Sequence, residues 1–353
     1  MISAVGGALK AVRMHGHGGV EQLFFEDTND PLIDGPGQAI VKLSAAAINH
    51  IDIWNRRGLT GVQISMPHIL GADGAGMVVN VSGDVENVRV GDAACLYPPT
   101  GCGQCEFCLT DRDFMCFRFR VLGERLEGTY AQYVKLPAQN CFPIPTGFSF
   151  EEAAAFPLVF ITVWRMLITN ARLEPGETIL ILGIGGGVAS ASLQVAKKIG
   201  VRIIATSGSD KKLEMARDLG ADHRINHASK DFVKEVQTLT ADRGVDVVLD
   251  CIGGEFWRKS IASLTQGGRL VTCGATAGGE AKDDIAAICS KELKIYGSTL
   301  GSREEFRQVI NFLNAVKTKP VIDSIFPLEG AAAAQLHLEK ARQFGKIVLQ
   351  IPR

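Results

Sequence analysis

The stretch LILGIGGGVASASLQVAKKIG, residues 180–200, decides the fold of much of this chain. A short apolar run leads into four glycines within five residues, and an amphipathic segment of helical period follows. Glycines between a strand and a helix allow a tight turn and a close approach of the backbone to a phosphate. The stretch therefore predicts a strand–turn–helix unit that binds a nucleotide pyrophosphate at the helix N-terminus. A purely structural glycine-rich turn is the alternative.

The alternation of apolar runs and amphipathic segments continues along the chain. Apolar runs alternate with amphipathic segments, in the order VRIIATSGS, DKKLEMARDLG, VDVVLDCIGG and GGRLVTCGAT. Strands that alternate with helices of this length predict a doubly wound parallel sheet.

The flanking segments have a different character. Residues 38–49, 74–83 and 129–137 are β-type runs bounded by glycine and proline, which predict a mostly antiparallel, barrel-like unit. A helix near 303–316 and a strand at 344–351 are expected to return to that unit. The predicted domains are therefore residues 1–158, with a lobe at about 95–118, then a cofactor domain at 159–298 and a return at 299–353.

Composition limits the class of protein. The 353 residues are 46% hydrophobic, and 37 Lys and Arg balance 38 Asp and Glu. This balance gives no indication of nucleic-acid or acidic-membrane binding. The first residues lack the apolar core of a signal peptide, and the longest apolar run, 153–164, is too short to span a bilayer. A cytoplasmic protein is expected. The scattered cysteines are predicted to be small buried thiols in a reducing compartment: Cys95, Cys141, Cys251, Cys273 and Cys289.

The glycine turn supplies the candidate cofactor residues. In the Gly-x-Gly-x-x-Gly register, Gly183 and Gly185 are the first two glycines and Val188 falls at the third. Gly186 and Gly187 keep the turn open to a phosphate. Gly274, after the apolar run GGRLVTC, is a further candidate.

The end of the second strand predicts which dinucleotide binds. A site for NAD requires a carboxylate there to accept from the ribose 2′-hydroxyl. Instead, Thr206 and Ser207 occupy that place, and the first acid, Asp210, comes in the next turn. Small hydroxyls with Lys211 and Lys212 suit a 2′-phosphate, so NADPH is predicted over NADH, which stays possible. The lysines could also be a solvated first helical turn.

A second motif concerns a metal. Cys102-x2-Cys105-x2-Cys108-x7-Cys116 places four soft ligands in one loop, which predicts a closed tetrahedral zinc site. A site with four thiolates has no open position for water or substrate, so the predicted zinc is structural. An iron–sulfur cluster and disulfides are the alternatives.

Together these motifs resemble those of the medium-chain dehydrogenase/reductase superfamily, the alcohol dehydrogenase and quinone oxidoreductase group. NHIDIWNRRG, LGADGAGMV, GCGQCEFC, LGERLEGTYAQYVKLP and EEAAAFPLVFITVW occur in that family's order over nearly the whole chain. The resemblance implies an α/β fold: an N-terminal GroES-like β-barrel catalytic domain with a Rossmann cofactor domain. It also implies a homodimer or homotetramer.

The departures from the family pattern concern its catalytic zinc. The motif for the first ligand reads Asn49-His50-Ile51-Asp52, and the motif for the second reads Gly71-Ala72-Asp73. The third ligand position falls near Pro157 or Leu158. The resemblance therefore implies the metal-free active site of the quinone oxidoreductases.

The implied reaction is hydride transfer from NADPH to a quinone or an α,β-unsaturated carbonyl. Two alternatives remain: an alcohol or ketone dehydrogenase for bulky carbonyls, and a non-catalytic NADPH-binding protein. Asn49 is either a hydrogen-bond donor at the nicotinamide pocket or a backbone brace, and Asp52, grouped with it as catalytic, resembles a buried brace.

The resemblance suggests further site residues. Trp54 is a candidate wall of the substrate pocket, and His50 a candidate phosphate contact. Thr162 and Lys346 match cofactor positions of the family, and the loop at 297–302 matches one that carries dimer contacts.

Overall fold

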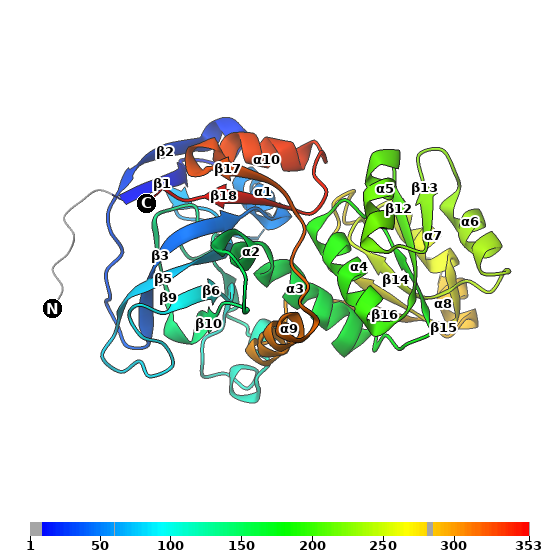
Figure 1. Cartoon of the computed structure of the whole chain (residues 1–353), viewed down its shortest axis with the longest axis horizontal. Coiled ribbons are helices and arrows are strands. Elements are labelled where there is room, and N and C mark those ends of the chain that lie inside the picture. The colour runs from blue at the N-terminus through cyan, green and yellow to red at the C-terminus, as the bar shows by residue number, and fades with distance from the viewer. Residues whose placement is uncertain (1–8, 60, 281–284, 353) are drawn as a thin grey trace. The chain divides into compact units, whose positions relative to one another are not determined.

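The computed structural model describes residues 9–59, 61–280 and 285–352, and its chain forms two compact units. Unit 1 combines Met1–Leu158 with Ser302–Arg353, and unit 2 is Val159–Gly301. The chain therefore completes unit 2 before it returns to unit 1, from green and yellow to orange and red in Figure 1.

Unit 2 is built on one parallel sheet of six strands in the order β13-β12-β11-β14-β15-β16. The order reverses between β12 and β14, beside the first strand, so the predicted doubly wound sheet is confirmed. Its strands are β11 (Thr178–Ile181), β12 (Arg202–Ser207), β13 (His223–Asn226), β14 (Val245–Asp250), β15 (Leu264–Thr272) and β16 (Lys294–Gly297).

The helices of unit 2 bury the apolar faces of this sheet. Its helices are α4 (Gly187–Ile199), α5 (Asp210–Leu219), α6 (Phe232–Leu239), α7 (Phe256–Ala262) and α8 (Ile285–Ser290). Helices α4 and α5 contact each other and β12, while α6 and α7 contact each other, with α7 on β14 and β15. Strand β14 is buried at every position, as expected for a central strand with both faces covered.

Unit 1 is the predicted, mostly antiparallel unit. Its largest sheet has the order β10-β6-β5-β3-β18-β17, with β9 also paired to β3. The exception is the parallel pair β17–β18, in which the returning end of the chain joins the sheet beside β3. Its elements before the return are β1 (Leu9–Met14), β2 (Leu23–Thr28), β3 (Gln38–Ala47), α1 (His50–Arg57), β4 (His68–Ile69), β5 (Asp73–Val81), β6 (Ala93–Leu96), β7 (Pro99–Thr100), β8 (Arg120–Val121), β9 (Tyr133–Pro137), β10 (Cys141–Pro143) and α2 (Phe150–Ala155).

The returning segment closes unit 1. Helix α3 (Pro157–Trp164) spans the boundary between the units, and the return comprises α9 (Arg303–Val316), β17 (Ile322–Pro327), α10 (Ala331–Glu339) and β18 (Lys346–Gln350). Because β18 lies beside β3, it places Lys346 close to the residues that follow β3. None of the helices in the described part of the chain is long and apolar enough to cross a membrane.

The isolated cysteines differ in part from the prediction. Cys95 and Cys141 are buried in unit 1, but Cys251 and Cys273 are only half-buried and Cys289 is exposed. The prediction of small buried thiols is therefore wrong for three of the five. The reason is their position: Cys251 and Cys273 come just after strands β14 and β15, outside the core of the sheet.

Candidate active site and metal site

The glycine turn of unit 2 has the geometry of a phosphate cradle. Gly183 adopts φ +64°, a left-handed conformation that favours glycine. Gly186 is the N-cap of α4 and provides no side-chain cap, so the first N–H groups of the helix are not capped by a side chain there. Thr206 supports the turn, because its hydroxyl and its carbonyl accept from the N–H groups of Gly183 (3.4 Å) and Ile184 (2.9 Å). Val188 lies half-buried in the first turn of α4.

The end of β12 carries the groups that would meet the 2′ end of a dinucleotide. Ser207 is buried, and its hydroxyl accepts from the backbone N–H of Ser209 at 3.1 Å. The carboxylate of Asp210 accepts from the Asn226 amide at 2.7 Å, whereas Lys211 is exposed. The first acid after this strand is therefore already engaged in a hydrogen bond.

The candidate catalytic residues of unit 1 form a buried cluster around Asp73. The Lys346 ammonium lies 3.0 Å from Asp73 Oδ2, and the Asn49 amide donates to the same oxygen at 2.9 Å. Lys346 also donates to the Asn49 Oδ1 and, at 2.9 Å, to the Ile48 carbonyl. Asp73 Oδ1 accepts from the backbone N–H of Leu158 at 2.8 Å.

Within this cluster, every side-chain N–H group of Lys346 and Asn49 is directed at an acceptor. An ammonium has three N–H donors, and Lys346 directs them at Ile48, Asn49 and Asp73. The two amide protons of Asn49 are directed at Asp73 and, more loosely, at the Ala47 carbonyl at 3.4 Å. The geometry thus favours the bracing role of Asn49 over the donor role, and it leaves Lys346 no proton for the cofactor contact that the resemblance implied.

The same cluster decides whether a catalytic metal fits. A cation needs free lone pairs, and both Asp73 oxygens accept from N–H groups, one of them from an ammonium. At the other ligand positions of the family, Asn49 Oδ1 accepts from Lys346, Ala72 has no donor atom, and neither Pro157 nor Leu158 has a side-chain donor atom. The donor set does not fit a zinc ion.

Asp52, three positions after Asn49, is fully buried. Its Oδ2 accepts from the backbone N–H of Asn49 and from the Tyr130 hydroxyl, both at 2.8 Å. Burial raises the pKa of this carboxyl to about 7, although these two hydrogen bonds lower it. Asp52 therefore fixes the start of α1 and the Tyr130 hydroxyl, as a buried brace does, and its grouping with the catalytic residues stays a prediction.

His50 and Trp54 share one face of α1. Their ring centroids are 6.2 Å apart, and both side chains are half-buried. Burial, with a smaller contribution from Lys346, lowers the pKa of His50 to about 4. His50 is therefore neutral at pH 7, so it lacks the charge that would attract a phosphate. The pocket role of Trp54 stays a prediction.

The four clustered cysteines are brought together as a metal site requires. The sulfurs of Cys102, Cys105, Cys108 and Cys116 all lie within 4.8 Å of one another. Cys108 Sγ is 3.9 Å from that of Cys102 and 3.6 Å from that of Cys105. A tetrahedral zinc with Zn–S bonds of about 2.3 Å holds its sulfurs about 3.8 Å apart. The spacing fits zinc and is too wide for disulfide bonds of about 2.05 Å.

The backbone around the sulfurs is shaped for this role. Backbone N–H groups of Cys102 and Arg118 each donate to Cys116 Sγ at 3.3 Å, as they would to a thiolate. A Cβ on Gly101 would come within 2.6 Å of Cys108 Sγ, so the close packing of the loop requires glycine. Zinc bound here would fix the lobe, since four protein ligands leave no position for substrate.

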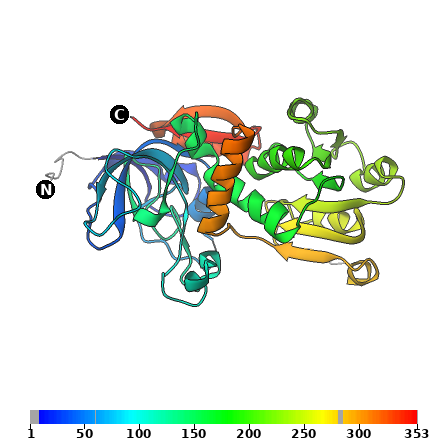
Figure 2. The same cartoon turned by 60° about the horizontal axis from the view of Figure 1, so that its bottom comes forward.

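The lobe is tied to the returning helix α9. Asp113, in the lobe, accepts from the Tyr97 hydroxyl at 3.1 Å and lies 3.6 Å from the Arg303 guanidinium. Figure 2 shows the orange α9 beside the blue-green lobe.

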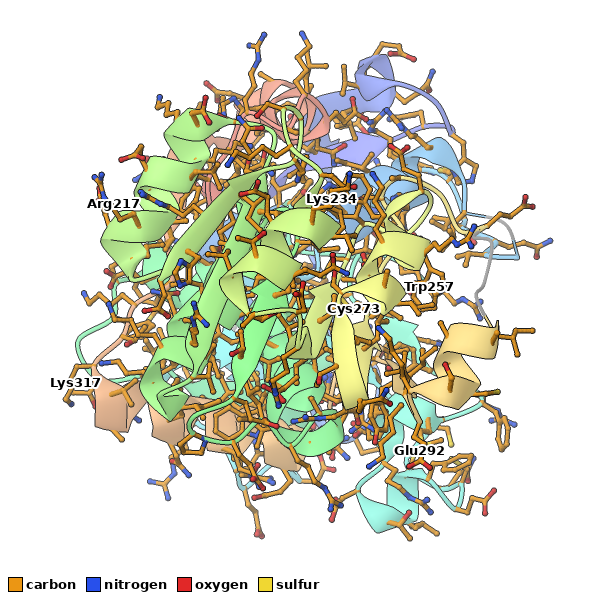
Figure 3. The ribbon with its side chains drawn as sticks, turned by 90° about the vertical axis from the view of Figure 1, so that its right-hand side faces the viewer. Arg217, Lys234, Trp257, Cys273, Glu292 and Lys317 are labelled. Atoms are coloured by element: carbon orange, nitrogen blue, oxygen red, sulfur yellow. The ribbon has the colours of Figure 1, made fainter. Side chains whose placement is uncertain are left out.

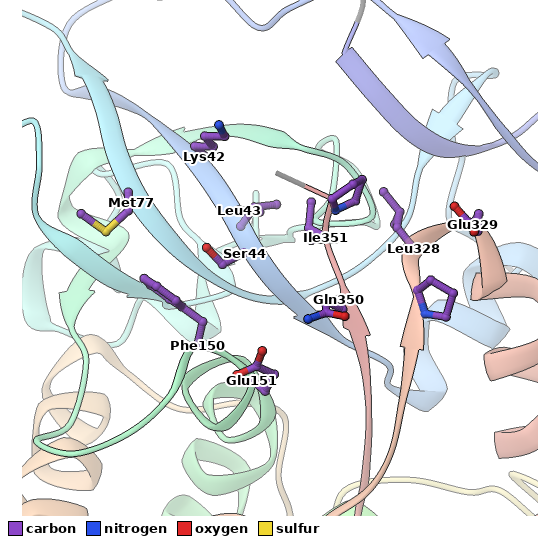
Figure 4. Close-up of a pocket in the computed structure, with 12 residues that line it drawn as sticks. Lys42, Leu43, Ser44, Met77, Phe150, Glu151, Leu328, Glu329, Gln350 and Ile351 are labelled. Atoms are coloured by element: carbon purple, nitrogen blue, oxygen red, sulfur yellow. The ribbon is translucent and has the colours of Figure 1, made fainter.

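A separate cavity of about 510 Å³ opens on unit 1 (Figure 4). Its walls come from β3, β5, α2 and β18, with Lys42, Phe150 and Gln350 among them. None of the Asp73 cluster lines it, so the candidate site is not located there.

The predicted cofactor residues Thr162 and Gly274 belong to unit 2. Thr162 is buried in α3, and Gly274 follows β15. Sequence reasoning missed Tyr130 and the contact between Lys346 and Asp73. Lys346 and Asp73 are 273 positions apart, so no local pattern could have indicated their contact.

Comparisons with known proteins fit this geometry. The sequence profile of the family described as zinc-binding dehydrogenase matches residues 187–315, and that of the alcohol dehydrogenase GroES-like domain matches residues 35–146. An NAD-dependent alcohol dehydrogenase of Sulfolobus acidocaldarius is 32% identical over 350 residues, which cover 97% of this chain and 100% of that protein. A quinone oxidoreductase of Rattus norvegicus is 27% identical, with 97% of each chain covered. A crystal structure of an NAD-dependent alcohol dehydrogenase superposes with a TM-score of 0.93 at 42% identity, covering 97% of this chain and 100% of that one.

Proposed function

The chain belongs to the medium-chain dehydrogenase/reductase superfamily, with a GroES-like unit 1 and a Rossmann unit 2, and on this basis we propose a specific activity for it. It transfers hydride from NADPH to a quinone or an α,β-unsaturated carbonyl, without a catalytic zinc.

The observation that carries this proposal is the Lys346 ammonium. It sits between Asn49 and Asp73, the residues at the family's first and second metal-ligand motifs. Its charge cancels that of Asp73 inside the protein. The cluster therefore provides neither a Lewis acid nor a free base, and the acceptor has to accommodate the incoming negative charge itself.

Conjugated acceptors meet this requirement. When bound, the cofactor supplies the hydride. In an enone or a quinone, the charge that develops spreads over the carbonyl and the double bond, so little stabilisation is needed from the protein. The chain contributes by orienting the dinucleotide on the N-terminus of α4 and by holding the start of α1 rigid through Asp52 and Asp73.

The choice of NADPH is supported by the end of β12. The first carboxylate after that strand, Asp210, is hydrogen-bonded to Asn226, and Lys211 is exposed nearby. A 2′-phosphate would find a cation and hydroxyls there.

Alcohol oxidation is the second candidate, and the names of the relatives favour it. It requires a base for the alcohol proton. Among the described residues near the cluster, His50, with a pKa of about 4, is a weak base, and Asp52 is fully buried and already accepts two hydrogen bonds on its Oδ2. The geometry therefore ranks this activity below the reduction of conjugated carbonyls.

Steady-state kinetics on zinc-loaded protein separate the two activities. We expect turnover with a quinone and with an enone in the presence of NADPH, and little with a secondary alcohol and NADP⁺ or NAD⁺. The saturated ketone that matches the enone is the control, because it differs only in conjugation. Higher kcat/KM for the alcohol and the saturated ketone than for the enone would assign the protein to the second activity.

A further inference from the structure

Two thiols of unit 2 lie in direct contact. The Sγ atoms of Cys251 and Cys273 are 3.3 Å apart, and both residues are half-buried. They follow the last residues of two adjacent parallel strands, since Asp250 of β14 is paired with Thr272 of β15. Cys273 is labelled in Figure 3, at the end of the yellow strand β15.

The loops that carry the two thiols are fastened to each other. The N–H of Gly254 donates to the Gly278 carbonyl at 3.0 Å, and the N–H of Ala277 donates to the Ile252 carbonyl at 2.8 Å. Gly253 has φ +66°, and a Cβ there would come within 2.9 Å of the Gly278 oxygen. These contacts hold the backbones of the two loops close, so the approach of the sulfurs is built into the fold.

The pair adjoins the glycine turn. Both loops leave the carboxyl ends of parallel strands, where ligands bind in open α/β sheets. Ile252, next to Cys251, lies against the turn, because a Cβ added to Gly183 would meet its Cδ1 at 3.1 Å. Gly274, next to Cys273, is a predicted cofactor residue. A change at the two sulfurs would therefore reach the glycine turn through Ile252, and it would also displace the predicted cofactor residue Gly274.

We propose that Cys251 and Cys273 form a peroxide-sensitive dithiol, whose oxidation to an intramolecular disulfide weakens dinucleotide binding to unit 2. This proposal goes beyond the proposed function, because it concerns cofactor binding and not the acceptor.

The chemistry balances with one peroxide as the oxidant. The Cys273 thiolate attacks a peroxide oxygen, the O–O bond breaks, and the leaving hydroxide takes up the proton that the thiol released, so the products are a sulfenic acid and one water. The sulfur of Cys251 then attacks the sulfenic sulfur, the S–S bond forms, and the second water leaves with the Cys251 proton. Contact with Cys273, together with burial, raises the pKa of Cys251, and the same balance holds if the two sulfurs exchange roles.

The structural effect follows from the bond length. A disulfide has an S–S distance of about 2.05 Å, so the sulfurs must come more than about 1 Å closer than they are. That movement pulls on Ile252 and Gly274, and it alters the surface that meets the cofactor.

The test uses the zinc-loaded full chain treated with hydrogen peroxide. Peptide mapping by mass spectrometry identifies the disulfide, and fluorescence titration gives the Kd for both NADPH and NADH. We expect a Cys251–Cys273 crosslink and a rise in Kd of about tenfold, within the usual range of coupling between sites. Dithiothreitol should restore the original Kd.

Variants separate this pair from the other thiols. Cys251→Ser and Cys273→Ser should abolish the effect of peroxide on Kd, whereas Cys289→Ser, an exposed thiol of the same unit, should retain it. The zinc content of each sample is measured as well, because oxidation of the four clustered cysteines would release the metal and would be detected separately. Absence of the crosslink, an unchanged Kd despite the crosslink, or a rise that persists in both Ser variants would overturn the proposal. The test measures only dinucleotide binding. Its result therefore does not depend on whether the acceptor in the proposed function is correct.

Discussion

Asp73 holds a buried negative charge whose oxygens accept from Asn49, Leu158 and Lys346. Removal of one partner from a buried ion pair leaves the other charge uncompensated, which typically costs about 3–5 kcal/mol. Lys346→Met should therefore reduce the free energy of unfolding by about that amount. Urea unfolding monitored by circular dichroism measures it.

A double-mutant cycle tests whether the two residues act as a pair, and its second single variant is Asp73→Asn. In the double variant no buried charge remains, so most of the lost stability should return. If the two single effects simply add, Lys346 and Asp73 do not act as a pair.

Asp52 predicts a specific dependence of stability on pH. Its pKa is about 7 in the folded protein, against an ordinary value of 3.8. A raised folded pKa means that the folded state binds the proton more tightly, so its stabilising contribution is complete below pH 3.8 and is lost as pH rises through about 7. Asp52→Asn removes this titration. Between pH 4 and 7.5, the urea midpoint of the wild type should fall relative to that of the variant as pH rises. A constant difference would show that Asp52 stays charged when buried.

At the scale of elements, the strand–turn–helix unit at 180–200 could be predicted because all its signals are local. The apolar run became β11, the glycines became the turn, and the amphipathic segment became α4. The cysteine spacing is equally local. The Asp73 cluster is not, because Asn49 and Lys346 reach Asp73 from 24 and 273 positions away. The pairing of β3 with β5 brings Asn49 to Asp73, and the pairing of β3 with β18 brings Lys346 to both.

The end of β12 and the start of α5 determine the third prediction. Lys211 is exposed there, so its contact with a 2′-phosphate should lie at the low end of about 1.5–3 kcal/mol for charge-assisted hydrogen bonds. Lys211→Ala should raise the KM for NADPH by about tenfold and leave that for NADH nearly unchanged. Lys234→Ala, an exposed lysine on α6 (Figure 3), is the matched control. An equal rise with both cofactors would mean that Lys211 supports the fold of α5 instead.

At the scale of the whole molecule, metal and cofactor are assigned to different units. The only group of three or more metal-binding side chains within the described residues is the cysteine cluster of unit 1, whereas the phosphate cradle belongs to unit 2. Zinc binding should therefore govern the stability of unit 1 without taking part in hydride transfer.

This division predicts about one zinc per chain, released by a thiol-reactive reagent, because each ligand is a thiolate. Cys108→Ser should lower the zinc content and the melting temperature. NADPH affinity, measured below the unfolding transition, should stay near that of the wild type, because the glycine turn contains no zinc ligand. Cys141→Ser, a buried thiol of unit 1 outside the cluster, is the control and should keep its zinc. Two zincs per chain, with catalysis lost when a chelator removes the more accessible one, would contradict the metal-free active site. In that case Lys346 would have to leave Asp73, because the ammonium and the metal would compete for the same oxygen.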